Sequence, residues 1–330
     1  MGADLAHWPV NKGLILKTII LKLMEKLGAQ LSRYGAIANP LPVAPNAKIF
    51  FVASSDSVGY SDLQQEFPVD KDGEVRVFTT VAAAIDACVA DRGDVIYVMP
   101  GHLETISSAT SVVFNKAGVS VIGLGTGSKR PEFNFSNTAG SLELDADNVR
   151  LSNFILKADV SAVVVGVNVD GDNVTIDNCL FTFNATGDDF VTMIDVDTVD
   201  GFTLKNCVLK AEEGAAGCAE AIRLDTANDC TIEGNHITGD FTDGAIIGEG
   251  AAGINLVIKN NTIYNADTTA GFVIDLNVAF TGLLAYNACG TLFATAPETA
   301  LDPGSLLSIE NYVVNAVDET GTVVPVTAST

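Results

Sequence analysis

Several residue types are scarce in this chain of 330 residues, and each scarcity excludes a class of protein. The six cysteines include no CxxC pair and the three histidines lie far apart, so the clustered ligands of a zinc site are missing. We therefore expect no metal ion, and no motif indicates a cofactor. Lysines interrupt the longest apolar run, which is shorter than the roughly 20 residues of a membrane-spanning helix, so we expect no membrane contact.

Basic residues are also scarce, with 18 Lys and Arg against 41 Asp and Glu and a net charge of −23. The charge is uneven, because residues 1–45 carry a net +3 and the remainder a net −26. A body this acidic repels phosphates, which excludes nucleic acid as a partner. The basic segment suits an acidic partner, including the body of a neighbouring copy.

Composition divides the chain into four parts. Residues 1–45 combine an expected helix with a Pro-rich linker, and 46–118 form an N-terminal cap with an expected helix that begins at Thr79 or Thr80 and ends at Gly93. Residues 119–292 form the repetitive body, and 293–330 form a C-terminal cap or tail. The GLGTG stretch at the start of the body is a phosphate loop only if a helix follows it, and otherwise a tight turn.

The body repeats one eight-residue segment at intervals of 25 to 28 residues. The repeat is rich in β-formers, alternates with period two and has no helical stretch between copies. A period of this size indicates a solenoid, and this composition predicts an all-β parallel β-helix. The copies are VRLSNFIL (149–156), VTIDNCLF (174–181), FTLKNCVL (202–209), CTIEGNHI (230–237), LVIKNNTI (256–263) and LLAYNACG (283–290).

Alternation assigns a direction to each position of the segment. Positions one and three face the core, and position five, usually Asn, makes a corner in the left-handed conformation. Position six turns inward again, where stacked amides can hydrogen-bond along the column. We interpret Cys179 and Cys207 there as small buried residues, with a disulfide between coils or reactive chemistry as alternatives. The expected stack is Phe154, Cys179, Cys207, Asn235, Asn261 and Ala288.

Position seven faces outward and is aliphatic in three consecutive coils, at Ile155, Leu180 and Val208. The inside of a solenoid is already filled, so an aliphatic stripe outside it favours an interface with another chain. Cover by the protein's own loops is the alternative.

Acidic residues mark the shorter strand before each segment. Asp195 and Arg223 face outward on neighbouring coils, and Asp197 and Asp225 follow them. Such a group suits Ca²⁺ or acid and base roles in glycan cleavage. We favour turn-forming residues and an ion pair between coils, because an Asp recurs once per coil. We therefore expect no catalytic site.

The repeated segment, clearest in LVIKNNTI, resembles the parallel β-helix repeat of the pectate-lyase-like superfamily. Residues 80–106 and 119–133 resemble its capping helix and first coil, and residues 308–325 resemble phage structural proteins. The polygalacturonase patterns Gly-His-Gly and Arg-Ile-Lys are missing. Within the superfamily the chain is most similar to decoration and cement proteins of tailed-phage virions, which implies a right-handed solenoid with an N-terminal helical anchor and a short capping helix.

This resemblance implies a structural virion protein on the outer surface of a phage capsid, not an enzyme. The expected partners are the major capsid protein and two further copies of the chain, in a homotrimer that buries Ile155, Leu180 and Val208. The alternative function is a tailspike-like protein that binds or depolymerises polysaccharide with Asp195, Asp197, Arg223 and Asp225. The N-terminal segment either docks on the capsid or caps the open end of the solenoid. The expected docking residues are Trp8, Leu14, Ile15, Ile19, Leu23 and Leu27.

Overall fold

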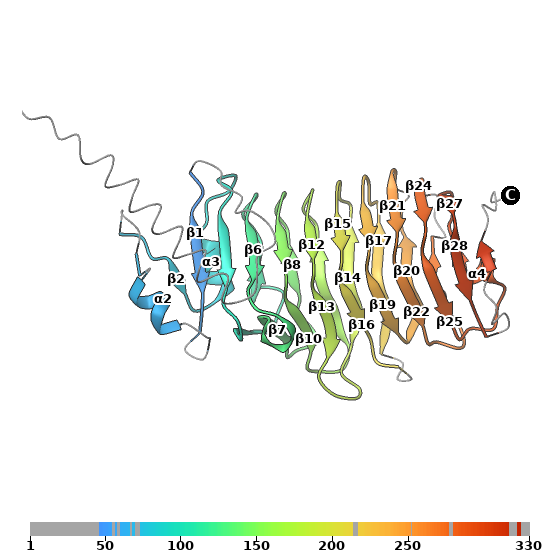
Figure 1. Ribbon diagram of the computed structural model, residues 1–330, viewed down its shortest axis with the longest axis horizontal. Coiled ribbons are helices and arrows are strands. Elements are labelled where there is room, and N and C mark those ends of the chain that lie inside the picture. The colour runs from blue at the N-terminus through green and yellow to red at the C-terminus, as the bar shows by residue number, and fades with distance from the viewer. Residues whose placement is uncertain are drawn as a thin grey trace, which may run out of the picture.

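The winding of the chain follows from the pairing of its strands, which form three long sheets. Each successive coil adds one strand to each sheet, so the sheets run side by side along the solenoid (Figure 1). This arrangement is a right-handed parallel β-helix and confirms the predicted fold class. The computed structural model describes residues 46–316 and 322–324, apart from 55–56, 58–59, 67, 70–72, 214–216, 252 and 277–279.

Strand pairing is parallel throughout the three sheets, except that β29 pairs antiparallel with β28. The eleven-stranded sheet contains, in spatial order, β2 (Val77–Phe78), β1 (Ile49–Val52), β3 (Val95–Val98), β6 (Ser120–Gly123), β9 (Arg150–Ser152), β12 (Thr175–Asp177), β15 (Thr203–Lys205), β18 (Thr231–Glu233), β21 (Leu256–Lys259), β24 (Gly282–Ala285) and β27 (Leu307–Ile309). The ten-stranded sheet contains β4 (Leu103–Ile106), β7 (Glu132–Phe135), β10 (Ile155–Ala158), β13 (Leu180–Phe183), β16 (Val208–Lys210), β19 (His236–Gly239), β22 (Thr262–Asn265), β25 (Ala288–Thr291), β28 (Asn311–Val314) and β29 (Thr322–Val324). The eight-stranded sheet contains β5 (Val112–Val113), β8 (Leu142–Leu144), β11 (Val163–Val169), β14 (Phe190–Asp197), β17 (Cys218–Asp225), β20 (Phe241–Glu249), β23 (Ile274–Asp275) and β26 (Leu301–Asp302).

Helices are few and short in the described part of the chain, and none of them is long and apolar enough to cross a membrane. Only a three-residue 3-10 helix follows the GLGTG stretch, which supports a tight turn there. The helices are α2 (Tyr60–Glu66), α3 (Val81–Ala87), η1 (Gly127–Lys129) and α4 (Pro297–Ala300).

Helix α3 begins where the sequence predicted and ends earlier. Thr80 caps it, since its hydroxyl oxygen accepts the backbone N–H of Ala83 at 3.2 Å. The predicted end at Gly93 is wrong, because the chain is already extended at Cys88. The carboxylate of Asp94 accepts the backbone N–H of Val89 at 3.0 Å and so stabilises a loop in place of the last helical turns.

The core and the corners of the coils follow the predicted pattern. The inward side chains at positions one and three, such as Val174 and Ile176, have no exposed surface. The corner residues Asn153, Asn178 and Asn206 have φ of 66°, 55° and 54°, the left-handed conformation that asparagine tolerates. All six cysteines are free and buried, which agrees with a packing role for the pair on the position-six stack.

Position six carries a buried amide ladder in the later coils. The side-chain oxygen of each ladder asparagine accepts the backbone N–H of the preceding position-six residue at 2.9–3.1 Å. Its Nδ2 donates to a backbone carbonyl of the preceding coil at 2.8–3.1 Å. The ladder therefore bonds each coil to its neighbour from inside the solenoid. Its members are Asn235, Asn261, Asn287 and Asn311.

The predicted alignment of the sixth segment is wrong by one residue. Leu256 pairs with Gly282 and Thr262 with Ala288, so the segment is GLLAYNAC and Tyr286 makes the corner with φ of 57°. Asn287, rather than Ala288, occupies the buried stack. The amide ladder fixes this register, whereas the corner residue is exposed and its type is less constrained.

Candidate functional site

The outer face of the eight-stranded sheet brings the four predicted site residues together. Parallel pairing of β14 with β17 sets Asp195 beside Arg223, and Asp197 beside Asp225. The guanidinium of Arg223 donates through Nε to Oδ1 of Asp195 at 2.9 Å and through Nη2 to its Oδ2. These hydrogen bonds raise the pKa of Arg223. Both carboxylate oxygens of Asp195 are therefore bonded within an ion pair between coils.

Asp197 and Asp225 belong to a column of acidic residues in register on successive coils. Each accepts a hydrogen bond from the hydroxyl of the next residue, Thr198 at 2.7 Å and Thr226 at 3.0 Å. Both threonines have positive φ, so the carboxylates stabilise tight turns. Strand pairing places the column at Asp145, Asp170, Asp197, Asp225 and Glu249.

Three carboxylates come close together at one end of the acidic column, a convergence that the sequence did not predict. Carboxylate oxygens of Glu143, Asp145 and Asp170 lie within 4.8 Å of one another. Partial burial and then the neighbouring carboxylates raise the pKa of Asp145 and Asp170 above ordinary values. Oxygen ligands of this kind suit Ca²⁺, but a regular acidic column places carboxylates together without any ion. Glu143 could have been found from the sequence, because it is the outward residue of the LEL strand.

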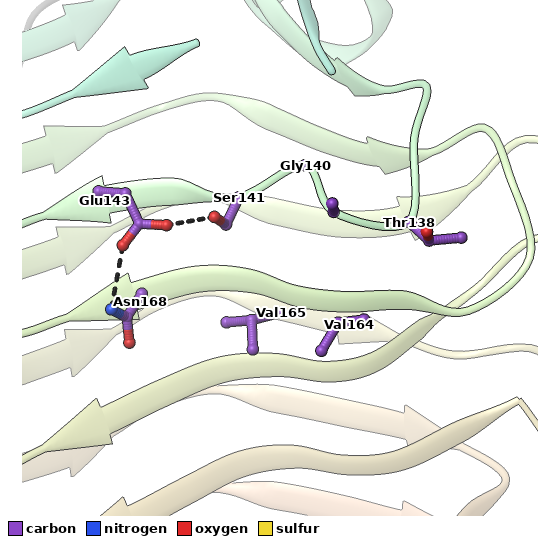
Figure 2. Close-up of a pocket in the computed structure, with 8 residues that line it drawn as sticks. Thr138, Gly140, Ser141, Glu143, Val164, Val165 and Asn168 are labelled. Carbon is purple, nitrogen blue, oxygen red and sulfur yellow. Dashed lines mark hydrogen bonds between the residues drawn. The ribbon is translucent and has the colours of Figure 1, made fainter. Parts of the chain in front are cut away.

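A hollow of about 380 Å³ lies beside this convergence, between the turn that precedes β8, β8 itself and strand β11. Glu143 accepts hydrogen bonds from the hydroxyl of Ser141 and, at 3.0 Å, from the Nδ2 of Asn168 (Figure 2). Val164 and Val165 line the opposite side. The polar groups of the hollow thus bond one another across two coils.

The histidine of the repeated segments lies away from the four predicted site residues. His236 is on the ten-stranded sheet, in register between Val208 and Thr262, and is exposed. It therefore does not face Asp195 or Arg223 on the eight-stranded sheet.

The aliphatic stripe at position seven is in register on β10, β13 and β16. Its exposure rises along the solenoid, because Ile155 is 8% exposed, Leu180 is half-buried and Val208 is 36% exposed. Ile155 thus has little surface left for a neighbouring chain. The alternative explanation, that the protein's own chain covers the stripe, accounts for Ile155 and not for Val208.

The predicted docking residues of the N-terminal segment, from Trp8 to Leu27, lie outside the described residues. Their docking on a capsid stays a prediction.

Comparison with known proteins gives two distant likenesses. No protein-family model and no curated protein matches the sequence. The pectate lyase Pel9A is similar at 14% identity and a TM-score of 0.43, over 82% of this chain and 78% of that chain. ORF18 of Geobacillus virus E2 is similar at 10% identity and a TM-score of 0.34, over 71% of this chain and 57% of that chain. Likenesses this distant carry no argument about function, and the fold rests on the strand pairing described above.

Proposed function

We propose that this chain is a structural virion protein, a decoration or cement protein on the outer surface of a tailed-phage capsid. The observation that carries the proposal is the in-register pair Leu180 and Val208, which projects aliphatic surface from a solenoid whose interior is full. Exposed aliphatic stripes of this kind are typical of interfaces. Stiff coils stacked by backbone pairing then form a block that ties neighbouring subunits together, and no bond is made or broken.

The hydrogen bonds of the acidic residues on the eight-stranded sheet support the same proposal. The carboxylate of Asp195 is engaged by Arg223, and Asp225 accepts the backbone N–H of Ala251 at 2.9 Å as well as its threonine. These groups bond coil to coil, which is the work of a structural element. The major capsid protein and further copies of the chain are its proposed partners.

The aliphatic pair makes the homotrimer testable. Leu180→Glu with Val208→Glu should abolish the trimer and lower the mass in solution, because it places charge at the centre of the trimer interface. The matched control is Thr182→Glu with Thr238→Glu, which adds the same charge to outward positions one pleat beyond the stripe, on β13 and on β19. Sedimentation velocity measures the mass and circular dichroism checks the fold. A monomeric parent, or an unchanged mass for the first variant, contradicts the trimer.

A second candidate function is a tailspike-like polysaccharide binder or depolymerase. The observation that favours it is the hollow beside Glu143, Asp145 and Asp170. Copy number in purified virions separates the two, since a decoration protein occurs in hundreds of copies and a tailspike in few. A low copy number, together with shortening of capsular polysaccharide by the purified chain, would reject the structural proposal.

A further inference from the structure

The outer surface of the eleven-stranded sheet changes character toward its C-terminal end. One outward column reads Thr203 and Thr231 in the middle coils, and then Val257, Leu283 and Leu307. The next outward column is charged at Lys205, Glu233 and Lys259, and then becomes apolar at Ala285, which is buried, and at the exposed Ile309. The last coils therefore present apolar side chains where the middle coils present polar ones.

The ten-stranded sheet changes in the same way around the adjacent corner. Tyr312 and Val314 face outward from β28, and Tyr286 occupies the corner of the preceding coil. Leu307, Tyr286 and Tyr312 are 53%, 55% and 52% exposed, which is high for large apolar side chains on three neighbouring elements. We call this surface the C-terminal apolar patch, and its members are Tyr286, Leu307, Ile309, Tyr312 and Val314.

Side-chain charge from residue 260 onward is of one sign, and the cation just before it, Lys259, is paired with Glu233 at 3.3 Å. Residues 260–330 contain seven carboxylates and no Lys, Arg or His. Glu310 is exposed within the patch, and Asp275 lies in register with Asp302 on the same coils. Partial burial and then the charge of Asp302 raise the pKa of Asp275. A partner that is both apolar and basic fits this end of the solenoid.

The chain itself contains such a partner outside the described residues. Residues 1–45 carry a net +3 against −26 for the rest, and they include Trp8 and the aliphatics Leu14, Ile19 and Leu23. We propose that residues 1–45 of one copy dock on the C-terminal apolar patch of a second copy. The contact joins copies of this chain to one another and does not depend on the capsid assignment.

The arrangement of the ends favours a second copy as the acceptor. Residue 46 precedes β1 at one end of the solenoid and the patch lies at the other end (Figure 1). Eleven strands span about 48 Å at the usual spacing between strands. Within one copy the segment would have to run back along this whole length, whereas a second copy can present its patch directly. Each copy then gives one segment and receives another, which is a head-to-tail contact.

Trp8 is the only tryptophan of the chain, so its fluorescence reports where the segment lies. In a dilution series of the full chain we expect blue-shifted emission at high concentration and a red shift on dilution. Leu307→Glu with Tyr312→Glu should move the midpoint to at least about tenfold higher concentration. The matched control is Thr203→Glu with Thr262→Glu, in the same two outward columns of the middle coils, and it should behave as the parent.

A mixing experiment tests whether docking occurs between copies. A Trp8→Phe chain has no tryptophan and an intact patch, and the Leu307→Glu, Tyr312→Glu chain has Trp8 and a broken patch. Adding the first to the second should shift the Trp8 emission to the blue. Leu307→Ser with Tyr312→Ser is the milder alternative if the glutamates disturb folding in circular dichroism.

Other occupants of the patch give other outcomes. Emission that does not change with concentration, combined with no shift on mixing, indicates docking within one copy or elsewhere and overturns the proposal. A concentration-dependent shift that persists unchanged in both patch variants also overturns it. A patch variant that lowers the mass without moving the Trp8 emission indicates two patches packed on each other, and again rejects residues 1–45 as the occupant.

Discussion

The coils before residue 210 and the coils after it are stacked by different chemistry. In the earlier coils position six is apolar, at Phe154, Cys179 and Cys207, whereas in the later coils it is a ladder of asparagines. The outer surface changes further along the chain. Ion pairs link neighbouring coils as far as Lys259 with Glu233, and exposed apolar residues gather on the coils after them.

This difference shows how the same backbone fold can carry different outer surfaces along its length. Arg150 with Asp177, and Lys157 with Glu132, join earlier coils from outside at 2.9 Å and 2.5 Å. The later coils add buried hydrogen bonds between coils, where water does not compete. After Lys259, the last coils carry exposed apolar residues such as Leu307 and Tyr312 at outward positions.

The largest effect should come from cutting the amide ladder. Asn261 accepts the backbone N–H and the Nδ2 of Asn235 at 2.9 and 3.0 Å, and its own Nδ2 donates to the carbonyl of Ile232 at 3.0 Å. Asn261→Ala leaves several buried polar groups unpaired, so we expect a loss of about 3–4 kcal/mol in the free energy of unfolding. Urea unfolding at a fixed protein concentration measures it.

Cys207→Ala is the control for this loss. It removes a buried thiol at the same position of an earlier coil, and we expect a cost of about 1 kcal/mol. Equal losses for the two variants would mean that the ladder contributes no more than ordinary packing, and the contrast between the two halves would fail.

A smaller effect should come from the outer ion pairs. Arg223 and Asp195 have side chains 32% and 13% exposed, so solvent weakens their attraction. We expect a coupling of about 1 kcal/mol in a double-mutant cycle of Arg223→Met and Asp195→Asn, falling as salt is added. A coupling that is insensitive to salt would show that the pair acts through packing rather than charge.

The sequence predicted the fold because period-two alternation and corner asparagines are local signals. The eight-residue segment of each coil contains both inward and outward residues at fixed positions. Leu180 and Val208 could therefore be placed in one column before their pairing was known. The acidic column could be interpreted correctly for the same reason, since one Asp per coil is a pattern of turns. Glu143 lies in the other outward column, with Asn168, Asp195 and Arg223, and the pattern of one Asp per coil does not include it.

The remaining errors come from interactions between coils that no single segment encodes. Tyr286 stands where asparagine was expected, and only the buried bonds of Asn287 reveal the true register. Ile155 was placed correctly in the stripe, yet its burial depends on its surroundings in space. Elsewhere on the outer surface, Arg130 donates to the carbonyl of Asn178 two coils away at 3.0 Å. Such long-range contacts have no signature in a repeat.

The smallest effect, and the sharpest test of the comparison, should come from extending the ladder by one coil. At present Sγ of Cys207 accepts the backbone N–H of Cys179 at 3.4 Å and lies 3.8 Å from the carbonyl oxygen of Ile176. These are the two positions that Oδ1 and Nδ2 satisfy in every ladder asparagine. Asn235 already accepts the backbone N–H of Cys207 at 2.9 Å, so the ladder reaches this coil from one side.

We therefore expect Cys207→Asn to stabilise the chain by up to about 1 kcal/mol, because each new bond replaces a weaker contact with sulfur. Urea unfolding beside Cys207→Ala checks the sign. If asparagine destabilises as much as alanine does, the amide is not transferable between coils and the apolar stack of the earlier coils has its own packing requirement. If it stabilises, the two halves share one backbone and differ only in their side chains. The residue at position six of each coil can then be polar or apolar without a change of fold.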